Sequence, residues 1–160
     1  SKLTNTLLSC VPPFVQLAGA AALSEALTER DTRMHEFRDK VMQLVTHLNQ
    51  VPGISCLQPG GSFYAFPNVA EVCNENRISS HGLAMYFLEG ADNHKGVACL
   101  GGECFGEAGR GFLRMSCSEP VERMIEAVEF IAASIRNPRN VAEYLVKRPQ
   151  YRLDQPYKIA

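Results

Sequence analysis

The sequence contains no apolar run near the roughly 20 residues that a membrane-spanning helix requires, and residues 1–11 lack the apolar core of a signal peptide. It also lacks an excess of either charge: 16 basic and 17 acidic residues leave a formal net charge of −1. That balance removes the electrostatic argument for binding nucleic acid or an anionic membrane. With 46% hydrophobic and 21% charged residues, and no repeat or low-complexity tract, the sequence predicts an ordinary globular fold.

The 6 cysteines include no C-x-x-C pair, and Cys99 and Cys104, the closest two, have no histidine at metal-ligand spacing. We therefore expect no metal site. The chain is also long and apolar enough to fold without a disulfide framework. We interpret the cysteines as mostly buried free thiols in a reducing compartment, which predicts a cytoplasmic location.

Apolar residues recur at helical spacing in several segments. Pro12-Pro13 begins an alanine-rich helix that runs to Leu27, and a long amphipathic helix follows from Thr32 until Pro52-Gly53. Three more helices are expected, starting at Ser79 or Ser80, after Pro120, and after Asn137, the last fading by 147–149. Residues 149–160 are expected to form an extended tail.

Four short segments have the composition of strands bounded by glycine or proline: 54–57, 62–66, 97–100 and 112–117. Together with the helices they predict an α+β fold. We expect a small antiparallel or mixed sheet of about four strands with helices packed on one side, a long N-terminal helical link, and a C-terminal tail.

The last of these strands carries an arginine in its middle. Strand alternation places Leu113, Met115 and Cys117 on one face and Phe112, Arg114 and Ser116 on the other. An arginine there presents a planar fork of donors suited to a carboxylate or a phosphate. Pattern alone leaves two other interpretations open, a solvated sheet face and a structural ion pair.

Other catalytic patterns are weak. The glycine-rich loop 101–111 has neither G-x-x-x-x-G-K-[ST] nor G-x-G-x-x-G, so tight turns explain its glycines better than a phosphate cradle. The four histidines have no local serine, cysteine or carboxylate arrangement typical of a triad. Nothing in the sequence indicates a lowered thiol pKa at Cys104, which argues against a cysteine nucleophile.

Three motifs nevertheless occur in a familiar order. Residues 96–116 resemble the G-V-x-V-x-P-G-x-x-F-G-x-x-G-x-x-x-x-R-x-S segment of class I/II pyridoxal-phosphate (PLP) aminotransferases, with Gly101 in place of the usual proline. Residues 59–64, P-G-G-S-F-Y, resemble the P-x-G-x-F-Y strand of that family's small domain. Residues 13–18, P-F-V-Q-L-A, resemble its P-x-x-x-Q-x-A helix start. The resemblance covers roughly residues 3–136.

The resemblance implies a role for two residues. Arg114 matches the family arginine that pairs with the substrate α-carboxylate, and Phe63 is expected to approach the substrate from the neighbouring strand. It also implies PLP as cofactor, an amino acid and a 2-oxo acid as substrates, and a homodimer when full-length. The family's Schiff-base lysine lies in an S-x-S-K-x-x-x-x-x-G-x-R-x-G stretch upstream of the glutamine helix. Ser1-Lys2 begins like that stretch, but Leu8 and Cys10 depart from it.

We therefore reject Lys2 as the catalytic lysine and expect no catalytic and no cofactor-binding residue in this piece. PLP is expected to be bound mainly by a missing upstream domain, so the piece alone should be inactive. The expected domains are 1–30 for the end of the cofactor domain and its linking helix, 31–136 for the small domain, and 137–160 for an extension. One alternative is a free-standing α+β module, either binding or regulatory, that holds an anionic metabolite through Arg114. The other is a structural interaction domain.

Overall fold

The computed structural model describes residues 11–24 and 28–158. The chain divides into two units, residues 1–34 and 35–160, and each is described by itself. In the first unit, helix α2 (Pro13–Ser24) begins at a proline, as predicted, because proline fits the first helical position. No residue of α2 is buried, and Phe14, Leu17 and Leu23 are more than two-thirds exposed.

Helix α3 (Thr28–Leu48) carries the predicted amphipathic pattern into the second unit. Its buried residues, Val41, Leu44, Val45 and Leu48, recur every three or four positions and so share one face. The helix ends before Pro52. Gly53 then turns the chain with φ = 79°, a backbone conformation that glycine adopts without strain.

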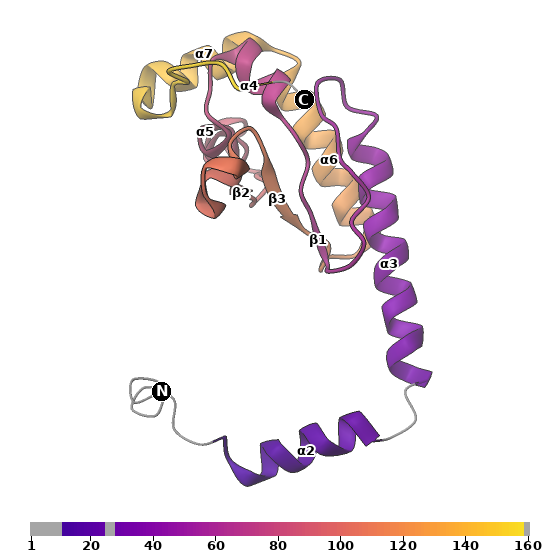
Figure 1. The fold of residues 1–160 in the computed structure, drawn as a ribbon. Coiled ribbons are helices and arrows are strands. Elements are labelled where there is room, and N and C mark those ends of the chain that lie inside the picture. The colour runs from indigo at the N-terminus through magenta and orange to yellow at the C-terminus, as the bar shows by residue number, and fades with distance from the viewer. Residues whose placement is uncertain (1–10, 25–27, 159–160) are drawn as a thin grey trace, which may run out of the picture. The chain divides into compact units, whose positions relative to one another are not determined.

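The sheet is antiparallel, and its strand order is β1-β3-β2. Its strands are β1 (Tyr64–Ala65), β2 (Leu100–Gly101) and β3 (Leu113–Ser116). Tyr64 pairs with Ser116, and Leu100 pairs with Arg114. Figure 1 shows α6 and the second half of α3 running along one side of this sheet. The α+β class predicted from the sequence is therefore confirmed.

The prediction of about four strands is wrong by one, because residues 54–57 form only an isolated bridge between Ser55 and Asn68. The reason lies in the side chain of Asn49, which directly follows α3. The Asn49 amide donates to the carbonyl oxygen of Cys56 at 3.0 Å and accepts from its amide at 2.7 Å. These two bonds satisfy the backbone of Cys56, so no neighbouring strand is needed there.

Two short helices follow β1. Helix α4 (Ala70–Asn76), which the sequence did not predict, begins where the Asn68 side chain accepts from the Ala70 amide at 2.9 Å. Helix α5 (Ser80–Met85) begins at the predicted cap, since the Ser79 hydroxyl accepts from the Gly82 amide at 3.0 Å. A wider helical turn, η1 (Tyr86–Gly90), extends α5.

The last two helices also begin where the sequence indicated. Helix α6 (Val121–Ile135) follows Pro120 and buries Met124, Val128 and Ile131. Helix α7 (Pro138–Lys147) is capped by the side chain of Asn137, which accepts from the Arg139 amide at 3.1 Å. These helices join α3, α5 and the inner face of the sheet in one apolar core. No helix in the described ranges is both long and apolar enough to cross a membrane.

The segment after α7 lies against the region between α4 and α5 rather than extending away from it. Backbone bonds join Ser79 to Tyr151 at 2.9 Å and Leu153 to Arg77 at 2.9 Å. Asn74 then binds the backbone of Tyr157 on both sides, at 2.8 Å and 3.0 Å. The tail is thereby fastened to the body of the second unit.

We expect Asn49→Ala to destabilise the chain by about 1–3 kcal/mol, since it leaves two partly buried backbone groups of Cys56 without partners. Urea unfolding monitored by circular dichroism measures the loss. Asn140→Ala on α7 is the matched control, because no hydrogen bond of its side chain occurs among the described residues. Equal stabilities of the Asn49→Ala variant and the wild type would show that the clamp is dispensable.

Candidate functional site

The site is built on β3, whose residues alternate between core and surface as predicted. Leu113 and Met115 are buried, Arg114 is half-buried, and Ser116 is exposed. Arg114 therefore stands on the face of the sheet that is turned away from the core. Because Leu100 pairs directly with Arg114, the two side chains share that face.

Two aromatic rings contact the guanidinium of Arg114. Its Cζ lies 4.4 Å from the centroid of the Tyr64 ring and 4.8 Å from that of the Phe105 ring. Both distances are those of cation–π contacts, in which the flat guanidinium meets the ring faces. The rings come from different segments, Tyr64 from β1 and Phe105 from the glycine-rich loop.

The edge of the guanidinium has no acceptor within the part of the chain that the structure describes. No ion pair and no hydrogen bond of the Arg114 side chain occurs there. The strand pattern left open that Arg114 makes a structural ion pair, and the described residues contain no such pair. A guanidinium held by its faces with its N–H groups free is suited to bind a planar anion in bidentate fashion.

More aromatic residues continue this surface. Phe66 stacks on Phe112, with ring centroids 5.3 Å apart and planes 15° apart, and it meets the edge of Phe105 at 6.0 Å. Phe63, which the sequence predicts to approach the substrate, is 43% exposed. The centroid of its ring lies 4.3 Å from that of Tyr64. Phe63 is thus one ring removed from the arginine, and the residue beside it makes the contact.

Sequence reasoning missed Tyr64 and Phe105 as partners of Arg114. Two signals could have found them. Tyr64 occupies the predicted strand 62–66, and Phe105 is one of the motif positions in the loop. Neither signal predicts that both rings contact the Arg114 side chain, because that contact depends on how the loop folds.

The loop between β2 and β3 folds as two short 3₁₀ turns, η2 (Gly102–Phe105) and η3 (Glu107–Gly109). The backbones of Gly102 and Gly109 touch, so that a Cβ on either would collide with the carbonyl oxygen of the other. The Gly102 amide also donates to the Phe112 carbonyl oxygen at 2.8 Å. The glycines thus serve close backbone approach, and the loop returns Phe105 to the sheet.

A carboxylate anchors the same loop. Oε1 of Glu103 accepts hydrogen bonds from the Ser80 hydroxyl at 2.7 Å, the Tyr157 hydroxyl at 2.9 Å and the His81 amide at 3.1 Å. The Ser80 oxygen also accepts from the Gly111 amide at 2.9 Å. One buried network therefore joins both ends of the loop to the start of α5 and to the C-terminal tail.

The network changes the acidity of its members. Burial raises the pKa of the Glu103 carboxyl, but the hydrogen bonds from Ser80, His81 and Tyr157 outweigh it and hold that pKa below its usual 4.5. Burial also raises the pKa of the Tyr157 hydroxyl, and the neighbouring Glu103 carboxylate adds to the effect. Glu103 is therefore ionised and Tyr157 is neutral at neutral pH.

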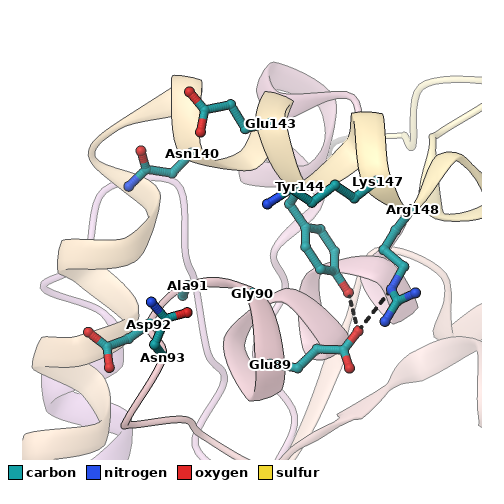
Figure 2. A pocket seen from close by; sticks show the side chains of 10 residues that line it. All are labelled: Glu89, Gly90, Ala91, Asp92, Asn93, Asn140, Glu143, Tyr144, Lys147 and Arg148. Atoms are coloured by element: carbon teal, nitrogen blue, oxygen red, sulfur yellow. Dashed lines mark hydrogen bonds and ion pairs between the residues drawn. The ribbon is translucent and has the colours of Figure 1, made fainter.

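A hollow of about 530 Å³ lies between η1 and α7 and shares no residue with the arginine site. Figure 2 shows Glu89 in this hollow, where it accepts from the Tyr144 hydroxyl at 3.0 Å and from Arg148 at 3.3 Å. Burial and the nearby Glu89 raise the pKa of Tyr144. No cluster of metal-ligating side chains occurs in the described ranges, here or elsewhere.

The structure thus defines a small α+β unit in which the guanidinium of Arg114 contacts two aromatic rings and has no acceptor among the described residues. No family model matches the chain. An aspartate aminotransferase of Pyrococcus horikoshii is 30% identical over 141 residues, which are 87% of this chain and 34% of that protein.

Solved structures agree with the sequence comparison. An aromatic aminotransferase from Pyrococcus horikoshii has a TM-score of 0.71 at 26% identity over 87% of this chain and 35% of its own. A PLP-bound putative aminotransferase from Clostridium difficile shares the fold, with a TM-score of 0.67 at 17% identity over 84% of this chain and 33% of its own. The chain spans about a third of the length of the relatives it matches.

The chain belongs to the fold type I aminotransferases, a family whose cofactor is PLP. The partial match is consistent with a C-terminal portion of such a protein. The arginine site offers PLP no lysine amine among the described residues. Lys40 lies on α3, Lys95 after η1, Lys147 on α7 and Lys158 in the tail, so no described lysine stands in the loop 101–111 or on the sheet. Lys2 lies outside the described residues.

The depressed pKa of Glu103 makes the stability of the chain depend on pH. A carboxyl with a lowered folded pKa stabilises the fold above its unfolded value, near 4.5, and that contribution is lost as the pH falls through the folded value. We therefore expect the stability difference between the wild type and Glu103→Gln to narrow as the pH falls from about 7 to about 3. Urea unfolding at several pH values measures it.

The control for this titration is Glu126→Gln, which removes an exposed carboxylate that pairs with Arg123 on α6. Exposed pairs of this kind contribute about 0–1 kcal/mol, so the control should differ little from the wild type at any pH. If the difference in free energy of unfolding between the wild type and Glu103→Gln stayed constant from neutral to acidic pH, the lowered pKa of Glu103 would be contradicted.

Proposed function

We propose that this segment is the substrate-carboxylate-binding part of a PLP-dependent aminotransferase, with Arg114 as the residue that holds the carboxylate. One observation carries the proposal. The guanidinium contacts the rings of Tyr64 and Phe105, with its Cζ 4.4 and 4.8 Å from their centroids, while its N–H groups have no acceptor among the described residues. Membership in the aminotransferase family supplies the matching ligand, an amino acid and its 2-oxo acid counterpart.

A carboxylate is common to both substrates of a transamination, so one arginine can serve both halves of the reaction. Two parallel N–H···O bonds fix the carboxylate in the plane of the guanidinium. They thereby orient the Cα of the substrate, and holding a reacting group in position lowers the barrier of a subsequent step. The rings of Tyr64 and Phe105 limit rotation of the guanidinium and exclude water from its faces.

In this proposal the segment binds and orients the substrate, and the bond-breaking chemistry takes place on PLP in the full-length protein. Bound PLP provides the electron sink of the reaction. The proposal assigns its lysine and most of its contacts to a cofactor domain upstream of this segment, with residues 31–136 as the small domain. By the same reasoning the segment alone is inactive, and the full-length protein acts on an amino acid and a 2-oxo acid as a homodimer.

In the full-length protein we expect Arg114→Ala to lower kcat/KM for the amino acid by about 30- to several-thousand-fold. Removing one partner of a desolvated charge pair costs roughly 2–5 kcal/mol. Arg114→Lys should also be poor, because an ammonium group lacks the planar fork. Steady-state kinetics with a panel of amino acids tests both variants and identifies the preferred side chain.

Arg123→Ala is the matched control for these kinetics. Arg123 is an exposed arginine on α6 that pairs with Glu126 and takes no part in the site. Its loss should leave kcat/KM within about twofold of the wild type. Unchanged kcat/KM in Arg114→Ala would refute the carboxylate-binding role.

The isolated segment offers a separate test of where PLP binds. Mixed with PLP, it should produce no stable absorption shift that depends on Lys2, because the sequence around Lys2 departs from the family's lysine motif at Leu8 and Cys10. Absorption spectra of the wild type and of Lys2→Ala, recorded before and after dialysis, make the comparison. A persistent shift that Lys2→Ala abolishes would show that the segment holds the cofactor.

A further inference from the structure

We propose that the C-terminal tail sets the geometry of the carboxylate site, with Tyr157 and Glu103 as positioning residues that act on Arg114 through Phe105. The inference rests on the proposed function of Arg114 and extends it to Glu103 in the loop and to Tyr157, which lies 43 positions after Arg114. Neither positioning residue touches the guanidinium among the described contacts. Their effect passes through the fold of the loop between β2 and β3.

The first step is the dependence of Arg114 on the loop. Its Cζ lies 4.4 Å from the centroid of the Tyr64 ring, which belongs to the sheet, and 4.8 Å from that of the Phe105 ring, which belongs to the loop. Phe105 is 48% exposed, so burial alone does not hold its ring. The conformation of the turn η2 (Gly102–Phe105) therefore decides whether the guanidinium keeps its second aromatic contact.

The second step is the anchoring of that turn. Glu103 belongs to η2, two residues before Phe105, and its Oε1 receives three hydrogen bonds. The other oxygen, Oε2, is buried without a partner among the described residues. Because Oε2 contributes no bond, the position of the carboxylate depends on the donors of Oε1. Two of these, the Ser80 hydroxyl and the His81 amide, belong to α5.

The third donor is the tail. The Tyr157 hydroxyl donates to Oε1 of Glu103 at 2.9 Å and accepts from the Ser80 amide at 3.1 Å. Its backbone is held by both polar atoms of the Asn74 side chain. Gly111, at the far end of the loop, lies close enough that a Cβ there would contact the Tyr157 ring at 3.3 Å. Tyr157 thus touches both ends of the loop.

Removal of the Tyr157 hydroxyl would leave Glu103 with fewer donors while the carboxylate stays ionised. The turn that carries Phe105 would then sample more conformations, and the guanidinium would lose part of its fixed geometry. A binding group that is less preorganised binds more weakly, because the ligand must order it. The expected defect is therefore in substrate binding, with little change in the fold.

The test is Tyr157→Phe in the full-length protein, compared with Tyr151→Phe. Tyr151 belongs to the same tail and is half-buried, but no hydrogen bond of its hydroxyl occurs among the described residues. We expect Tyr157→Phe to lower kcat/KM for the amino acid about tenfold, chiefly by raising KM, and to raise KM for the 2-oxo acid as well. Tyr151→Phe should stay within about twofold of the wild type.

A double-mutant cycle with Phe105→Leu separates positioning from general stability. If Tyr157 acts through Phe105, the two substitutions together should reduce kcat/KM by much less than the product of their separate effects. Fully multiplicative effects would overturn the inference, as would a Tyr157→Phe variant with wild-type KM. A loss of thermal stability with unchanged KM would also overturn it, because it would assign Tyr157 a structural role only.

The Arg114→Ala kinetics distinguish failure of this inference from failure of the proposed function. If Arg114→Ala is impaired while Tyr157→Phe is normal, the carboxylate role stands and the role of the tail is refuted. If Arg114→Ala itself is normal, the proposed function fails, and the inference fails with it.

Discussion

The proposed carboxylate site depends on the contacts of the Arg114 guanidinium with the rings of Tyr64 and Phe105. A carboxylate partner from the protein would hold the arginine equally well, but it would occupy the N–H groups that a ligand needs. The two aromatic contacts hold the guanidinium without using those N–H groups. The chain therefore positions a cation without neutralising it, and the proposed recognition of a small anionic substrate requires such a cation.

That arrangement is produced by a sheet with very little regular structure. Two of its strands are two residues long, and the third has four. Side chains replace missing backbone pairs: Asn49 binds residue 56, Asn74 binds residue 157, and Ser80 binds residue 111. Each such bond joins two particular residues, so it fixes the backbone at one point. A longer strand would instead have held the backbone in one regular extended conformation.

The sequence predicted the parts of the fold that depend on local chemistry. Helix starts at Pro13, Ser79 and Asn137 follow from proline and from capping side chains, and the exposure of Arg114 follows from strand alternation. The absence of a fourth strand and the partners of Arg114 could not be predicted in this way. Both depend on contacts between segments: the Asn49 side chain binds the backbone of residue 56, and Phe105 returns to the sheet in a loop whose Gly102 and Gly109 backbones touch.

The position of the C-terminal tail also depends on contacts between distant segments. Its composition, with prolines and scattered aromatic residues, predicts an extended segment and says nothing of where it lies. In the structure its Tyr157 hydroxyl reaches Glu103, whose pKa is lowered by the hydrogen bonds it receives. An ionised carboxylate that is partly buried must keep its donors, because an unpaired buried charge is costly. The loop that carries Phe105 is therefore coupled to the C-terminal tail through the Glu103 carboxylate, which needs the hydrogen bond from Tyr157.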